Sequence, residues 1–430
     1  MVAADVNERL IALRRDLHRH PEPAWREYYT TARLLEELNR IGVDELYIGE
    51  EALDRSWRWG VPDDEELAAW AQRAIADGAQ RERVEQLREG NTGIVARLNR
   101  GDGPHIGIRV DIDALQRTES TDPSHLPVAE GFRSKRDDAM HACGHDAHAT
   151  IGVGILESVV ASEFSGTLTM CFQPAEEEIG GGKAMAEGGH FDDVEYFMAL
   201  HVGLGYPTGT VVAGFDGFLA VTNVTATFEG AGSHAGSRPE VGKNAVQALA
   251  TATTNLYGIA RHHAGDTRLN VGRIEGGSAS NIIPDEAKLF GEVRGETTDL
   301  RDYMKDRAAT ILESAAAMHE CSVAIDFGPE APSATSDRKL AGVVEGVADS
   351  VTGVDTVIPI GTFTGSEDAT YLMEHVQANG GLATFVGIGT DHPGGHHSAT
   401  FDVDEMSLGI GVDVIMETIQ AIEDKPPQPV

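Results

Sequence analysis

Apolar residues recur at helical spacing over residues 5–42, so we expect a single helix there, interrupted near Pro21 and Pro23. Farther along the chain, short apolar runs typical of strands alternate with helical patterns. The strand-like runs begin near residues 93, 105, 167 and 196, and the helical patterns cover 147–162 and 181–189. This alternation predicts an α/β domain with a mostly parallel sheet flanked by helices.

Two segments depart from this alternation. Residues 50–90 are charged and contain three Trp residues, which indicates an inserted helical excursion. After residue 217 a long alternating strand begins, followed by helical patterns at 242–258 and 299–319 and strand patterns at 268–275 and 286–294. We therefore expect a compact α+β unit over residues 217–329, inserted into a catalytic domain that comprises residues 1–216 and 330–430.

Side chains that can bind metals are densest in the segment His141-Ala-Cys143-Gly-His145-Asp146-Ala-His148. A Cys and a His two positions apart can converge on one ion, and the Gly between them permits a tight turn. The alternative is a loop whose histidines serve only hydrogen bonding. A zinc knuckle is excluded because the chain has no second Cys pair, and Cys171 and Cys321 lie in apolar stretches typical of a core.

Further His and acidic residues follow other predicted strands or lie in adjoining loops. They are Asp111 and Asp113, Glu176, Glu177 and Glu178, His201, and the pair His396 and His397. Ligands of open α/β sheets bind at the carboxyl ends of the strands, and adjacent acids there can divide metal binding from general-base work. Each segment has a plain structural alternative, such as a solvated acidic turn or a structural His. Their joint occurrence nevertheless predicts a metal-dependent site.

Composition narrows the class of function. The 430 residues carry a net charge of −35, which disfavours nucleic acid and anionic membranes as partners. We expect a cytoplasmic protein, because no apolar run could span a membrane, the opening residues lack a signal-peptide core, and three Cys cannot form a disulfide framework. Only seven of the 34 basic residues are Lys, and this composition predicts a halophilic host; the alternative is an ordinary acidic bacterial protein. Nucleophile-elbow, Walker and dinucleotide-binding motifs are absent from the sequence.

Several motifs, in their order along nearly the whole chain, resemble the M20 metallopeptidase and amidohydrolase family. They are Val110-DIDAL, His141-ACGHDAH, Gln173-PAEE, Ala199-LHVG, Gly365-SED and His397-Ser398. The CGHD variant is similar to the branch of aminoacylases, hippurate hydrolases and auxin-conjugate hydrolases. The resemblance implies that the inserted unit is a ferredoxin-like lid that closes over the site and mediates dimerisation.

The resemblance also implies roles for individual residues. Two divalent ions, of Mn, Zn or Co, would be held by Cys143, His145, Glu177, His201 and His397. Glu176 would be the general base, His234 would stabilise the oxyanion, and Asn281 and Arg294 would lie near the substrate carboxylate. For Arg294 the alternative is a salt bridge on the lid surface. We choose His397 over His396 because the family's motif places an aromatic residue at the offset of Phe401, although Ala399 departs from the Pro of many members.

The implied reaction is the hydrolysis of a linear amide. A metal lowers the pKa of bound water from about 15.7 toward about 7, and Glu176 would take the proton and deliver it to the departing nitrogen. The segments Trp57-Arg-Trp-Gly-Val-Pro-Asp and Asn91-Thr-Gly-Ile-Val-Ala are similar to members that cleave aroyl-glutamates, so an N-aroyl or N-acyl glutamate such as p-aminobenzoyl-glutamate leads as substrate. Hippurate, other N-acyl amino acids or dipeptides are the alternative. The partner would be a paralogous subunit or a second copy of the chain. A catalytically silent relative that binds peptides or protein partners is the alternative from another class.

Overall fold

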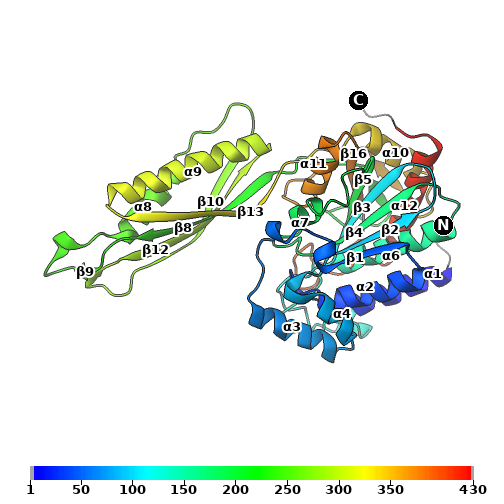
Figure 1. Ribbon diagram of the computed structural model, residues 1–430, viewed down its shortest axis with the longest axis horizontal. Coiled ribbons are helices and arrows are strands. Elements are labelled where there is room, and N and C mark those ends of the chain that lie inside the picture. The colour runs from blue at the N-terminus through cyan, green and yellow to red at the C-terminus, as the bar shows by residue number, and fades with distance from the viewer. Residues whose placement is uncertain (1–3, 428–430) are drawn as a thin grey trace. The chain divides into compact units, whose positions relative to one another are not determined.

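The computed structural model describes residues 4–427, which form two compact units (Figure 1). The first unit comprises residues 4–216, 335–363 and 367–427. The second comprises residues 217–334 together with 364–366. The second unit is thus inserted into the sequence of the first. No helix within residues 4–427 combines the length and the apolar composition that crossing a membrane requires.

The first unit contains most of the helices and one large sheet. Its helices are α1 (Ala4–Arg19), α2 (Tyr28–Ile41), α3 (Asp64–Ala76), α4 (Arg81–Gln86), α5 (Leu126–Ala129), α6 (His145–Ala161), α7 (Gly182–Ala186), α10 (Arg338–Ala348), α11 (Thr370–Ala378) and α12 (Met406–Asp424). Its strands are β1 (Glu45–Ile48), β2 (Ile94–Asn99), β3 (His105–Asp111), β4 (Thr167–Gln173), β5 (Tyr196–Val202), β6 (Thr210–Val212), β14 (Thr356–Ile358) and β16 (Leu382–Ile388), with the small pair β7 (Phe215–Asp216) and β15 (Gly361–Thr362).

The large sheet has the strand order β1-β2-β4-β3-β5-β16-β6-β14. Its four central strands, β4, β3, β5 and β16, run parallel, whereas β1 and β2 add antiparallel pairs at one edge. Side chains along β5 and β16 are buried throughout, as expected for strands covered on both faces. The mostly parallel sheet predicted from the alternating pattern is confirmed.

Helices form two groups around this sheet. Helix α6 packs against α1, α2 and α12, and α10 packs against α12, whereas α7 and α11 pack against each other. The segment expected to be one interrupted helix consists of two separate helices, because Pro21 and Pro23 remove backbone donors and the chain turns before Tyr28. Helix α2 ends where expected, at Gly42 in the left-handed region.

The predicted excursion at 50–90 is helical and packs on α2. The Asp63 carboxylate accepts a hydrogen bond from the Glu66 N–H group and so caps α3. Trp70 is buried with Tyr28 and Leu87 in a small apolar cluster between α2, α3 and α4. The excursion is therefore packed against the rest of the first unit through an apolar cluster of its own.

The second unit is an α+β sandwich. It contains β8 (Ala220–Glu229), β9 (Ser233–His234), α8 (Ala245–Leu256), β10 (Thr267–Gly276), β11 (Ile282–Ile283), β12 (Glu286–Gly295), α9 (Thr298–Met318) and β13 (Ser322–Ala331). Four long antiparallel strands lie in the order β10-β12-β8-β13. Helices α8 and α9 pack on one face of this sheet and bury alternate side chains of its strands. This βαββαβ order is the ferredoxin-like arrangement that the family resemblance implies for the insertion.

Candidate active site

The polar residues that follow the parallel strands lie at one edge of the sheet. Asp111 ends β3 and is the register partner of Gln173, which ends β4 three residues before Glu176. His201 lies near the end of β5 beside Gly387 of β16. Because these strands are parallel, their carboxyl ends bring segments that are far apart in sequence to the same place.

The turn at the start of α6 supplies two more candidate ligands. Gly144 precedes the helix with a φ of +94°, and a Cβ there would lie 2.5 Å from Cγ2 of Val202 in β5. Only Gly satisfies both the left-handed backbone and this close approach. The turn consequently holds Cys143 and His145 against the end of β5.

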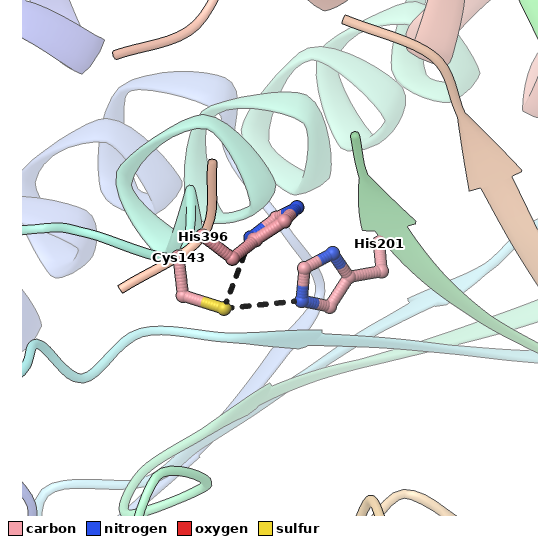
Figure 2. A group of neighbouring side chains, drawn as sticks. All are labelled: Cys143, His201 and His396. Carbon is pink, nitrogen blue, oxygen red and sulfur yellow. Dashed lines mark hydrogen bonds between the residues drawn. The ribbon is translucent and has the colours of Figure 1, made fainter. Parts of the chain in front are cut away.

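The structure brings the five predicted ligands together in one cluster, in which His397 is the exposed member. Cys143 Sγ lies 3.5 Å from His201 Nε2, as Figure 2 shows. His145 Nε2 lies 3.8 Å from Glu177 Oε1, and His397 Nε2 lies 3.5 Å from the other oxygen, Glu177 Oε2. Glu177 therefore lies between two imidazoles.

The hydrogen bonds of each histidine show whether it has a ring nitrogen with a lone pair free to bind a metal ion. His201 Nδ1 lies 2.7 Å from the Val202 carbonyl oxygen. A carbonyl oxygen can only accept, so the proton is on Nδ1, and the lone pair of Nε2 faces Cys143. His148 is bonded at both nitrogens, to Asp111 through Nδ1 and to the Val202 N–H through Nε2. It is thus a structural residue.

His396 is also bonded at both nitrogens. Its Nε2 accepts the Leu204 N–H at 3.0 Å, so the neutral ring carries its proton on Nδ1, which lies 3.5 Å from Cys143 Sγ (Figure 2). His396 is therefore suited to donate to the sulfur, and His397 keeps its Nε2 directed at Glu177.

Asp113 connects the strand end to the acidic loop. Its carboxylate accepts the N–H groups of Glu176 at 3.1 Å and Glu177 at 3.0 Å, and Oδ1 lies 3.2 Å from His145 Nδ1. This last contact places the proton of His145 on Nδ1 and leaves Nε2 directed toward Glu177. One buried carboxylate thus orients three candidate site residues.

Burial and the neighbouring charges set the pKa of Glu176. Burial raises its pKa well above the ordinary value, and the carboxylates of Glu367 and Glu177 raise it further. Arg109, fully buried in β3, offsets part of this negative charge: it donates to Asp111 at 2.8 Å and to Glu367 at 3.0 Å. Glu176 is thus a carboxyl group whose affinity for a proton is strengthened.

The cluster fits a divalent cation. Among the residues that the structure describes, His145 Nε2 and Glu177 Oε1 are buried without a hydrogen-bond partner, and both face the same space. Leaving such atoms unpaired is costly, whereas a cation between them would be coordinated by both. Thiolate, imidazole and carboxylate together are a donor set for Zn, Mn or Co.

The other predicted residues lie in the second unit. His234 pairs with Ile282 in the small two-stranded sheet of β9 and β11, and the Asn281 carbonyl oxygen accepts the Ala235 N–H at 3.0 Å, so His234 and Asn281 are exposed neighbours. Arg294 lies on β12 and forms a two-pronged ion pair with Glu292. A salt bridge of this kind is the structural alternative to a role of Arg294 in substrate binding.

Sequence reasoning missed two buried residues that support the site, Arg109 and Glu27. Arg109 was detectable as a lone cation in the apolar run of β3, because a buried Arg requires acidic partners. Glu27 had no such signal, since its partner Ala175 is 148 residues away.

Comparisons with known proteins agree with this fold and cluster. The family model described as peptidase family M20/M25/M40 matches residues 107–421. The chain is 42% identical to indole-3-acetyl-aspartic acid hydrolase of Enterobacter agglomerans and 40% identical to one of the subunits of p-aminobenzoyl-glutamate hydrolase of Escherichia coli K12, each over 409 residues and 94% of both chains. A dinuclear metal-binding M20 peptidase of Bacillus subtilis has a TM-score of 0.70 at 25% identity, over 98% of this chain and 99% of that one.

A split α/β domain with an inserted ferredoxin-like unit and a buried Cys, His and Glu cluster defines a metal-binding hydrolase. The chain belongs to peptidase family M20/M25/M40, as its motifs predict.

Proposed function

We propose that this chain hydrolyses the amide bond of an N-acyl amino acid, with two divalent ions held by Cys143, His145, Glu177, His201 and His397. The observation that carries the proposal is that His145 Nε2 and Glu177 Oε1, 3.8 Å apart at the sheet edge, are both buried without a hydrogen-bond partner. The bound ions would supply Lewis-acid activation of water and of the amide carbonyl.

Glu176 is the proposed general base. Burial and two carboxylate neighbours make its oxygens good proton acceptors, and Asp113 fixes its backbone N–H. A proton taken up at a Glu176 oxygen can then be delivered to the departing nitrogen, which is otherwise a poor leaving group. Glu176 lies near His145, with Oε2 3.8 Å from Nε2, so acid–base and ligand residues are adjacent.

His234 is the proposed donor to the oxyanion. Its Nδ1 accepts the N–H groups of Gly236 and Ser237, both at 3.1 Å, so the neutral ring carries its proton on Nε2. An N–H donor of this kind contributes about 3–4 kcal/mol in comparable oxyanion holes. Asn281, its neighbour beside the small sheet of β9 and β11, and Arg294 remain the proposed residues for the substrate carboxylate.

An N-aroyl or N-acyl glutamate is the substrate we propose, with p-aminobenzoyl-glutamate as the leading example. The two relatives at 40–42% identity are named for amides that join an aromatic acyl group to an acidic amino acid. An aromatic cluster supports this choice. Lys183 Nζ lies 3.6 Å from the ring centre of Trp57, and Trp59 lies beside Tyr371, with ring centres 6.4 Å apart. Rings of this kind can pack against an aryl group.

The aromatic cluster borders the acidic loop. The backbone N–H of Trp59 donates to the carbonyl oxygen of Gly180, four residues after Glu176, and the backbone N–H of Asp54 donates to the carbonyl oxygen of Ala184. The predicted excursion at 50–90 thereby contacts the segment that follows the proposed base. We expect Trp59→Ala to raise KM for aroyl-glutamates and to leave KM for N-acetyl-glutamate unchanged.

The test of the function is the release of free amine from a panel of N-acyl amino acids, with Mn or Zn added to metal-free protein. We expect turnover of p-aminobenzoyl-glutamate above that of hippurate, other N-acyl amino acids and dipeptides. Preference for hippurate would favour the alternative substrate class. Absence of turnover across the panel, with metal bound and the paralogous chain present, would favour a silent peptide-binding relative.

We also propose that the chain works in the cytoplasm as a dimer through its inserted unit. The Escherichia coli relative is named as one subunit of its hydrolase, which supports a paralogous partner as the alternative to a second copy. Assays of the chain with and without the paralogous chain distinguish the two arrangements.

A further inference from the structure

The backbone turns sharply immediately before the proposed base. Ala175 lies between the end of β4 and Glu176 and has a φ of +57°, in the left-handed region that residues with a Cβ rarely adopt. A non-Gly residue stays in this region only where its surroundings hold it there. The turn decides the direction in which Glu176 leaves the strand.

The Glu27 side chain holds this turn through a hydrogen bond to its backbone. Its Oε1 accepts the Ala175 N–H at 2.9 Å, and its Oε2 accepts the Thr92 hydroxyl at 2.6 Å. Thr92 is itself held, since its carbonyl oxygen accepts the Thr31 hydroxyl at 2.6 Å. Glu27 is fully buried at the start of α2, so its carboxylate has a fixed position.

The Asp113 carboxylate holds the next two residues, because it accepts the N–H groups of Glu176 and Glu177. Three consecutive backbone N–H groups are therefore bonded to two buried carboxylates that come from separate parts of the chain. The Asp113 contacts fix the position of the acidic pair, and the Glu27 contact fixes the strained residue that precedes it.

We propose that Glu27 is a positioning residue for catalysis: through the Ala175 N–H it keeps the turn in the conformation that directs Glu176 into the site. The inference rests on the proposed function, because Glu176 is its proposed base. Glu27 itself touches neither substrate nor the reacting atoms. A displacement of a catalytic group by about 1 Å is enough to cost about 10²-fold in rate.

The test compares Glu27→Ala with Glu27→Gln and with Glu22→Ala. Glu22 is an equally buried carboxylate, but it accepts the N–H groups of Tyr29 and Thr30 at the start of α2. We expect Glu27→Ala to lower kcat about 10²-fold with KM and metal content little changed. Glu27→Gln, which keeps an oxygen for the Ala175 N–H, should stay within about tenfold of the unchanged chain.

A second variant isolates the strained residue. Gly adopts a positive φ without cost, so Ala175→Gly added to Glu27→Ala should restore about tenfold of the lost kcat. Hydrogen exchange supplies a readout that does not depend on turnover: amides of the segment 174–181 should exchange faster in Glu27→Ala and remain protected in Glu22→Ala. If Glu27→Ala does not fold, Thr92→Val, which removes only the hydroxyl on Oε2, serves the same comparison.

Two results would overturn the proposal. One is a Glu27→Ala protein with unchanged kcat and unchanged exchange in the segment 174–181. The other is a loss of kcat that is equal in Glu22→Ala and is not restored by Ala175→Gly, which would assign both carboxylates to stability alone. Failure of the proposed function has a different signature, because the unchanged chain would then release no amine while the exchange difference persisted.

Discussion

Cys143 and His201 are 58 positions apart in the chain, yet Sγ of the one lies 3.5 Å from Nε2 of the other. The proton of His201 is committed to the Val202 carbonyl oxygen, so the atom that faces the sulfur is a lone pair. A thiolate and an imidazole lone pair at this separation could both bind one ion, as we propose.

Removal of this sulfur should remove metal. We expect Cys143→Ala to lose about half of the bound divalent metal, measured by elemental analysis after dialysis, because one ion then lacks its thiolate ligand. Cys171→Ala is the matched control, since Cys171 is buried in the interior of β4. An unchanged metal content in Cys143→Ala would exclude this residue as a ligand.

Replacement of the proposed base should separate turnover from metal binding. Glu176→Gln keeps the shape of the side chain but cannot accept a proton, so we expect kcat to fall by about 10²–10⁴-fold with metal content unchanged. Glu178→Gln, two positions along the same acidic run, should retain activity. Full activity of Glu176→Gln would remove this residue from the mechanism.

The stability of the first unit should depend on pH through His18. Burial and Arg14 lower the pKa of His18, but hydrogen bonds to Asp146 and Glu119 outweigh them and raise it to about 9. Because the folded pKa exceeds the unfolded value of about 6.5, the stabilisation is complete below pH 6.5 and is lost as the pH rises through 9. Its upper size is about 3 kcal/mol.

Urea unfolding at pH 6 and pH 9.5 measures this contribution. The unchanged chain should lose more stability between the two pH values than His18→Gln loses, while His263→Gln, at an exposed position, should behave as the unchanged chain does. Equal pH slopes for the unchanged chain and His18→Gln would contradict the assignment.

The inserted unit should mediate dimerisation. Strand β10 is an edge of its sheet, whose unpaired backbone groups are available to pair with a second chain, and Ile274 on this strand is 55% exposed. We expect light scattering in molar KCl to give twice the 45.9 kDa of one chain, and Ile274→Lys to shift the mass toward the monomer. Met406→Lys, at another exposed apolar residue but in the first unit, is the control. A monomer at high salt, with no effect of Ile274→Lys, would contradict this role.

Salt should stabilise the chain. A net charge of −35 repels itself in dilute buffer, and the screening length falls from about 10 Å at 0.1 M to about 3 Å at 1 M salt. We therefore expect Tm to rise steadily between low salt and molar KCl. A Tm that does not depend on KCl would favour the ordinary acidic alternative.

The periodicity of apolar residues predicted the mostly parallel sheet and the main helices and strands of the inserted unit. Helices α8 and α9 and strands β10 and β12 fall within a few residues of the expected ranges, because each is amphipathic and long. The division of the first segment into α1 and α2 was only half predicted: the prolines marked the break, but the length of the turn depends on contacts such as that of Glu22 with Tyr29.

The candidate site, too, could be predicted only in part from the sequence. Residues that carry their chemistry in their type, such as Cys143 and His145, could be found from the sequence, and their roles stay predictions. The groups that orient them could not, since the contact of Glu27 with Ala175 joins two segments that nothing in the local sequence relates. The choice between the substrate and Glu292 as the partner of Arg294 likewise depends on the pairing of side chains along β12.

The proposed ligands span positions 143 to 397, and the whole inserted unit lies between His201 and His397 in the chain. The ribosome therefore reaches the last of the proposed ligands only after the other four and the whole inserted unit have been synthesised. If His397 is a ligand as we propose, metal capture would be a late step in biogenesis, and a nascent chain arrested before residue 397 would retain less metal than a chain that includes it.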